Sequence, residues 1–283
     1  MSRLRTCTTD SFFSGQSVCE IDYGQIKGLV LVEHGTKLDY STLANLRNAC
    51  HADLPGRAYG FPPIINWEPS GGEAQFSQIG YGPNAYNGMS PRTDALTLDA
   101  FRHYLRSQII RNANKVWDMY LFDGRNNIYG LTDPEDDTAD MYGIPVTIYP
   151  SGNDHAGASD KASLVVNVAY QDVEEYMKRL DVVGLDYEAL TGIYGLMPVT
   201  LEKQGTTGSN YKVVEFHGKG DATSKYGALL ATGAASVING ITAATYDAEG
   251  NVLQLTVSDN ATPTLKKASV LCTNGIYGIE QKV

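Results

Sequence analysis

The stretch WDMYLFDGRNNIYGLTDPEDDTADMYGIPVTIYP, residues 117–150, decides the fold class. Two aromatic and aliphatic runs, 117–122 and 128–131, flank an Asp-Gly turn that starts at Asp123. An Asp-Gly pair between two such runs is a strong local signal for a β-hairpin. A third run, 144–149, predicts a further strand, so we expect the centre of the chain to be antiparallel β-sheet.

The same stretch is rich in carboxylates: Asp123, Asp133, Glu135, Asp136, Asp137 and Asp140. A calcium loop of the EF-hand type requires a glycine at its sixth position and a closing glutamate, and both are missing here. Neighbouring carboxylates on an extended chain also point to opposite sides. We therefore expect a solvated, negatively charged hairpin tip, with a loosely bound cation as the less favoured alternative.

Composition limits the class of protein. The chain has 283 residues, 42% of them hydrophobic and only 19% charged, with 29 Gly and 18 Tyr. Few charges and many tyrosines favour a β-rich protein that packs against other protein, although any loop-rich β protein shares this composition. The net charge of −10 disfavours tight binding to a phosphate backbone. It is compatible with a conduit past which DNA slides.

No targeting signal is evident. The N-terminal sequence MSRLRTCTTDSFFSG lacks the apolar core of a secretory signal, and no run reaches the ~18 apolar residues of a membrane span. We expect a protein made in the cytoplasm. The four cysteines form no CxxC pair, which predicts buried free thiols rather than a zinc site or disulfides. A metal site made of Cys7, Cys19 and His51 is the weak alternative.

The first third of the chain is dominated by an unusual loop. Residues 1–25 predict an arm ordered only by packing, 26–32 a strand, and 41–50 a short helix. Residues 52–92 combine many glycines and prolines with aromatic side chains, a composition unlike free disorder. We interpret them as an extended loop or hairpin that packs on a neighbouring subunit. The proposed inter-subunit residues are Tyr59, Phe61, Trp67, Phe76, Tyr81 and Tyr86.

Downstream, periodicity predicts a helix over 93–114, a strand over 163–170 and a helix over 172–180. The sequence pattern changes near Met197-Pro198. From there, short apolar runs with frequent turn signals predict only strands, among them 226–232 and 268–273. We expect two domains: 1–197, and 198–283 as a small immunoglobulin-like β-sandwich.

Motifs of catalysis are missing from the sequence. The five histidines do not have HExxH spacing, there is no GxSxG nucleophile elbow, and HGKGDATSK near His217 does not match a P-loop. Asp154-His155 lacks a third member of a triad. We therefore expect no enzyme activity, no catalytic residues, no metal and no cofactor.

The middle of the chain resembles the tail tube proteins of tailed bacteriophages. The resemblance rests on a helix leading into WDMYLFDGRNNIYGLTD, then GIPVTIYPSG, a strand and YQDVEEYMKRL, and it covers about residues 15–197. It implies a mainly β (α+β) fold: a sandwich or barrel with a flanking helix and a long loop, followed by the immunoglobulin-like module. The family has no catalytic residues to carry over.

The resemblance also implies assembly and location. Such subunits form rings, usually hexameric, that stack into the virion tail tube, with an acidic channel for DNA and the tape-measure protein and a tail terminator as a further partner. The acidic loop at 133–140 would then face the lumen or solvent. Alternatives are a head-tail connector ring, a capsid accessory protein or a carbohydrate- or surface-binding β protein. A hydrolase is a third class, but the sequence singles out no carboxylate pair for it.

Overall fold

The computed structural model describes residues 2–3, 24–78, 80–99, 102–132, 140–152, 162–205, 208–258 and 261–282. The chain divides into two compact units. The first is Met1–Leu46 with Ala58–Ile193, and the second is Arg47–Arg57 with Tyr194–Val283. The long C-terminal part therefore begins close to the boundary expected from sequence. The second unit also includes the distant segment 47–57, which the sequence did not point to.

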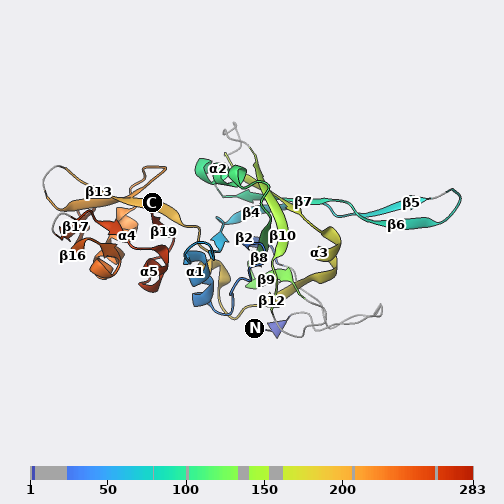
Figure 1. The fold of residues 1–283 in the computed structure, drawn as a ribbon, viewed down its shortest axis with the longest axis horizontal. Coiled ribbons are helices and arrows are strands. Elements are labelled where there is room, and N and C mark those ends of the chain that lie inside the picture. The colour runs from blue at the N-terminus through green and yellow to red at the C-terminus, as the bar shows by residue number, and fades with distance from the viewer. Residues whose placement is uncertain are drawn as a thin grey trace. The chain divides into compact units, whose positions relative to one another are not determined.

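The first unit is built on one large sheet, in which ten of the described strands take part (Figure 1). The main path runs β1-β12-β9-β8-β10-β11-β7-β4, and β2 pairs with β8 and with β3. The strands are β1 (Ser2–Arg3), β2 (Ile26–Glu33), β3 (Tyr59–Gly60), β4 (Ile64–Gly71), β7 (Arg92–Leu98), β8 (Trp117–Asp123), β9 (Asn127–Leu131), β10 (Ile144–Ser151), β11 (Val165–Tyr170) and β12 (Leu180–Gly184). The mainly β prediction is confirmed, as are the β8–β9 hairpin and the strands β2, β10 and β11.

Strand β8 is the centre of this sheet, and all seven of its residues are buried. One edge of β8 pairs with β2 along its whole length. The other edge pairs first with β10 and then with β9, so the sheet forks at this strand. A strand covered on both faces is expected to be mostly apolar, and β8 follows this rule except for Asp118 and Asp123, which are buried with hydrogen-bond donors.

A large apolar core lies on one face of the sheet in the first unit. Strands β7, β10 and β11 alternate between buried and partly exposed residues, and β4 lies next to β2. The inward side chains include Leu31, Leu96, Met119, Val146 and Val168, all at most 2% exposed. Burial of this apolar surface is the main favourable term for folding. The residues between these positions on β2 and β8 are buried too, so this part of the sheet is covered on both faces.

Three helices belong wholly or partly to the first unit: α1 (Leu43–His51), α2 (His103–Arg111) and α3 (Val173–Arg179). The predictions of α1 and α3 are confirmed. Asp172 caps α3 by accepting a hydrogen bond from the Glu175 N–H at 2.8 Å. The short 3₁₀ helix η1 (Ala189–Gly192) follows β12.

The predicted helix over 93–114 is wrong in its first half, because residues 92–98 form strand β7. Asp94, Leu96 and Leu98 are buried alternately, which is the period of a strand. The helical spacing starts only after Leu98 and ends in the shorter helix α2. The strand period of 92–98 runs directly into the helical period that follows Leu98, and the predicted helix wrongly included both.

The second unit is α+β. Its five-stranded sheet has the order β16-β17-β14-β13-β19, and β15 pairs separately with β18. The strands are β13 (Met197–Lys203), β14 (Asn210–Glu215), β15 (Ile238–Asn239), β16 (Ile241–Asp247), β17 (Val252–Val257), β18 (Thr264–Leu265) and β19 (Ile279–Gln281). The helices are α4 (Thr223–Gly233), the 3₁₀ helix η2 (Ala234–Ser236) and α5 (Ala268–Thr273).

The predicted immunoglobulin-like sandwich is wrong, since two of its expected strands are helices. Residues 226–232 lie in α4 and 268–273 form α5. In α5, Ala268, Leu271 and Cys272 are buried with helical i, i+3, i+4 spacing. In α4, Gly227 obscured the helical signal; a Cβ there would lie 2.5 Å from the Tyr246 ring, so the glycine lets that ring pack on the helix.

Among the described residues, no helix combines the length and apolar character needed to cross a membrane.

Candidate functional site

A long β-hairpin projects from the first unit. Strands β4 and β7 pair from Ile64↔Leu98 to Gly71↔Arg92, and the hairpin continues as β5 (Ala74–Gln78) and β6 (Asn84–Met89). Figure 1 shows β5 and β6 extending away from the sheet, beyond α3. We call residues 72–90 the arm. The hairpin predicted within 52–92 is therefore present.

The β4–β7 part of the hairpin passes into the β5–β6 part at two consecutive glycines. Gly71 and Gly72 have φ values of +83° and +79°, a region that favours glycine. Across from them, the Ser90 N–H donates to the Glu73 carbonyl at 2.8 Å, and the Glu73 N–H donates to Ser90 Oγ at 2.9 Å. These bonds carry the pairing past the glycines, so the arm continues the β4–β7 ladder.

The arm is exposed, and Glu73 at its base is the only charged residue in its sequence. Its sequence has no charged residue between Glu73 and Arg92. Phe76 is 61% exposed, Tyr86 is 53% exposed, and Tyr81 near the tip is fully exposed. Phe76 and Tyr86 face each other across the two strands with ring centroids 6.0 Å apart. A two-stranded ribbon with so little packing is marginal in water, and exposed strand edges usually carry charges that prevent association.

The root of the arm, in contrast, is fixed by a buried ion pair. Arg92 and Asp94 on β7 form two hydrogen bonds, Nε to Oδ1 at 2.9 Å and Nη2 to Oδ2 at 3.0 Å. Tyr170 on β11 donates to Asp94 Oδ2 at 2.8 Å, and the guanidinium lies over the rings of Tyr170 and Tyr176. Asp94 is completely buried. Burial opposes the charge on Arg92, but the bond to Asp94 outweighs it and raises the pKa of Arg92.

One further bond joins the arm to α3. The Tyr86 hydroxyl donates to Glu174 Oε1 at 2.9 Å, and Lys178 contacts the other oxygen of Glu174 at 3.3 Å. The arm is thus held to the body at its base, while its distal part and tip are presented to the outside.

The structure separates the six residues predicted to lie between subunits. Phe61 is in the core, and Tyr59 packs edge-on against the buried Trp117 at 5.4 Å, so both serve the protomer itself. Trp67 on β4 is half-buried against the core. The remaining residues, Phe76, Tyr81 and Tyr86, are exposed on the arm, and their inter-subunit role stays a prediction.

Most of the predicted acidic loop lies outside the described residues, namely Asp133, Glu135, Asp136 and Asp137. Nearly all of the N-terminal segment 1–25, which was predicted to be ordered only by packing, also lies outside them. Asp140 is described and exposed, with a carboxylate oxygen 3.5 Å from Lys37 Nζ. In the described part of the chain, no group of three or more His, Cys, Asp or Glu residues is placed to hold a metal ion.

Another buried carboxylate, Asp123, also has both oxygens occupied. Asp123 accepts from the N–H groups of Arg125 and Asn127, the Asn127 side chain, the Tyr129 hydroxyl and the Gly24 N–H, at 2.7–3.1 Å. Burial would raise the pKa of Asp123, but these donors lower it below the ordinary value. The Asp-Gly turn singled out from sequence is therefore pinned by its own aspartate, which also fixes the chain at Gly24.

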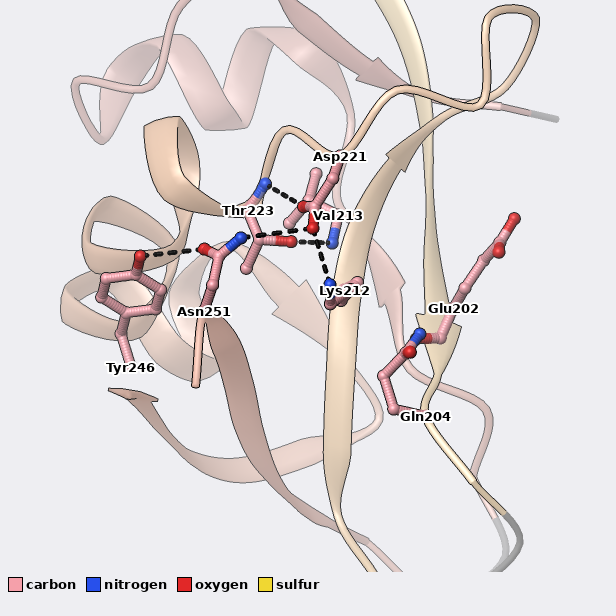
Figure 2. Close-up of polar contacts among 8 residues, drawn as sticks. All are labelled: Glu202, Gln204, Lys212, Val213, Asp221, Thr223, Tyr246 and Asn251. Carbon is pink, nitrogen blue, oxygen red and sulfur yellow. Dashed lines mark hydrogen bonds and ion pairs between the residues drawn. The ribbon is translucent and has the colours of Figure 1, made fainter. Parts of the chain in front are cut away.

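In the second unit, Asp221 plays a similar part (Figure 2). Its carboxylate accepts from Lys212 Nζ at 2.8 Å, the Thr223 N–H at 2.9 Å and Asn251 Nδ2 at 3.2 Å. Tyr246 donates to Asn251 Oδ1, which extends the network to β16. The bonds from Lys212 and Thr223 lower the pKa of Asp221 to about 2. Asp94, Asp123 and Asp221 thus each have both carboxylate oxygens engaged in hydrogen bonds that hold neighbouring elements together.

Comparison with known proteins gives little further guidance. No protein-family model matches the sequence, and no curated protein matches it. A chain in the cryo-EM structure of the anti-feeding prophage (AFP) baseplate, 6-fold symmetrised, resembles it with a TM-score of 0.25 and 11% identity. That alignment covers 59% of this chain and 99% of the other. A similarity of this size defines neither a shared fold nor a shared function.

Proposed function

We propose that this chain is a structural subunit of a virion that assembles with copies of itself, and that the assembly is the tail tube of a tailed bacteriophage. The observation that carries the proposal is the arm: an aromatic hairpin with no charged residue beyond Glu73 at its base, which projects from a well-packed body. An isolated ribbon of this kind gains stability only by packing on a partner. A neighbouring copy supplies that partner in every ring and between rings.

The remaining parts of the proposal come from the sequence resemblance and from charge. The subunits form a ring, hexameric in the simplest case, and the rings stack into a tube. The net charge of −10 suits a channel that passes DNA without holding it. The tape-measure and tail terminator proteins are the further partners, and the protein resides in the virion tail after synthesis in the host cytoplasm. We propose no enzymatic role.

The test is assembly of the full chain. Negative-stain electron microscopy and light scattering over a concentration series are expected to show rings or tubes with a central channel. The double variant Phe76→Ser/Tyr81→Ser is expected to remain monomeric, with an unchanged circular dichroism spectrum, because it removes apolar anchors and no core contact.

The matched control is Tyr149→Ser/Leu229→Ser, which removes two exposed apolar side chains outside the arm. It is expected to assemble like the wild type. A wild-type chain that stays monomeric at every concentration would contradict the proposed function. Assembly of the Phe76→Ser/Tyr81→Ser variant at wild-type concentrations would show that the arm is not the contact.

A further inference from the structure

The segment 47–57 is an insertion into the second unit from a distant part of the sequence. Two ion pairs hold it there: Arg57 Nη1 lies 2.8 Å from Glu280 Oε2, and Lys267 Nζ lies 3.0 Å from Asp53 Oδ2. Because the chain enters at 46/47, leaves at 57/58 and returns at 193/194, three chain crossings join the two units. Two of these crossings depend on the attachment of this segment.

At the centre of the attachment is His51, the last residue of α1, which is completely buried. Its Nδ1 lies 2.7 Å from the Arg47 carbonyl oxygen, and the Gly278 N–H donates to its Nε2 at 2.9 Å. The ring packs against Tyr194 and Tyr277, with centroids 5.3 and 5.7 Å away. The imidazole is therefore the direct link between the segment and the chain just before β19.

These two contacts require one protonation state. A carbonyl oxygen only accepts, so Nδ1 must carry the hydrogen; Gly278 N–H only donates, so Nε2 must be bare. The ring is therefore neutral. A second proton on Nε2 would remove the acceptor from Gly278 and place two N–H groups against each other in a buried site.

The surrounding groups oppose that proton as well. Arg47 lies on the same helix and Arg57 on the same segment, with Glu280 of β19 paired to Arg57. The other titratable neighbours, Cys50 on α1 and Cys272 on α5, are buried thiols. Burial chiefly lowers the pKa of His51, the bond to the Arg47 carbonyl opposes this, and the charges of Arg57 and Arg47 lower it further.

We propose that His51 is an acid-sensitive latch, whose protonation releases segment 47–57 from the second unit. The released state keeps the β13–β14–β17 pairing and loses the contacts of segment 47–57 with residues 267–280. Lower pH weakens the latch, because the folded site binds the second proton of His51 less readily than the released segment does. The latch is closed above pH about 6.5 and loosens as the pH falls further.

The test is amide hydrogen exchange by NMR on the full chain between pH 7.5 and 5.0, corrected for intrinsic rates. Protection of the Gly278 amide is expected to fall at least about tenfold more than that of Val213, whose N–H donates to Thr223 Oγ1 in the core. In His51→Gln, an amide oxygen replaces the Nε2 acceptor without titrating, and Gly278 is expected to keep its protection. His217→Gln, an exposed histidine of the same unit, serves as the control and is expected to behave like the wild type.

Equal loss at Gly278 and Val213, or the same loss in His51→Gln, would overturn the latch. If His51→Gln does not fold, the tautomer and titration of the His51 ring nitrogens in the wild type are measured by NMR instead. An Nδ1–H tautomer that titrates together with the Gly278 amide shift supports the proposal. An Nε2–H tautomer, or a pKa of His51 above 6.5, refutes it.

Discussion

At the scale of single residues, hydrogen-bonded carboxylates determine the local geometry. Asp94 fixes the root of the arm, Asp123 fixes the central hairpin turn, and the exposed Asp221 joins β14, the start of α4 and the β16–β17 turn. Each receives donors from residues far apart in the sequence. A buried charge is tolerated only when it is paired or hydrogen-bonded, and the buried Asp94 and Asp123 meet that condition.

Asp94→Asn is expected to destabilise the first unit by about 3–5 kcal/mol, because it leaves the half-buried Arg92 without its counter-charge. Urea unfolding monitored by tryptophan fluorescence measures the change, since Trp117 lies in the same core. Tyr170→Phe removes only one hydrogen bond of the same cluster and is expected to cost about 1 kcal/mol. Equal, small effects of both changes would contradict the assigned role of the ion pair.

Asp221 is expected to make the unfolding free energy of the second unit depend on pH in the acid range. Its pKa of about 2 in the folded chain is below the ordinary value of 3.8, so its contribution is complete above pH about 4 and is lost as the pH falls toward 2. Asp221→Asn is expected to flatten the decline of unfolding free energy with pH in that window, measured by urea unfolding at each pH. Glu249→Gln, at the exposed β16–β17 turn, should leave the decline unchanged.

At the scale of elements, the hairpin from β4 to β7 combines a rigid base and an exposed end. The base belongs to the large sheet, and the change from one to the other occurs at Gly71 and Gly72. These glycines are required by geometry, because a Cβ on Gly71 would lie 2.1 Å from the Pro91 carbonyl oxygen. Near the tip, Gly80 also has a positive φ of +63°, but nothing lies within 4 Å of its Cβ position.

Gly71 and Gly80 therefore allow a matched comparison, because both have a positive φ but only Gly71 is sterically confined. Gly80→Ala is expected to cost only the left-handed backbone term, about 1–2 kcal/mol, and only within the arm. Gly71→Ala adds a steric clash and is expected to open the pairing between β4 and β7. Hydrogen exchange of the β7 amides measures the difference, and similar β7 protection in both variants would show that Pro91 moves aside without consequence.

At the scale of the whole molecule, the second unit is discontinuous. The segment 47–57 supplies His51, Asp53 and Arg57 to contacts with residues 267–280. A boundary placed only near 197 therefore cuts a folded unit into two pieces. Loss of the segment would remove two ion pairs and leave the Gly278 N–H without its acceptor.

A fragment of residues 194–283 is accordingly expected to unfold at a lower temperature than the same unit in the full chain. Addition of a peptide of residues 43–57 is expected to restore part of the loss, as measured by calorimetry. The same peptide with His51→Ala and Arg57→Ala is the control and should restore less. A fragment as stable as the intact unit would show that segment 47–57 is dispensable.

The mainly β class, the β8–β9 hairpin and five of the ten described strands of the large sheet could be predicted from the sequence, because apolar patterning and Asp-Gly turns are local signals. The sequence also marked the uncharged aromatic stretch that became the arm. Only the tertiary structure decided which of those aromatics face outward, since Phe61 and Phe76 look alike in sequence and differ only in what packs on them. It likewise decided that 226–232 and 268–273 are helices and that 47–57 joins the second unit. Those outcomes depend on contacts between residues distant in the chain, such as Gly227 with Tyr246 and His51 with Gly278, and local propensity carries no information about them.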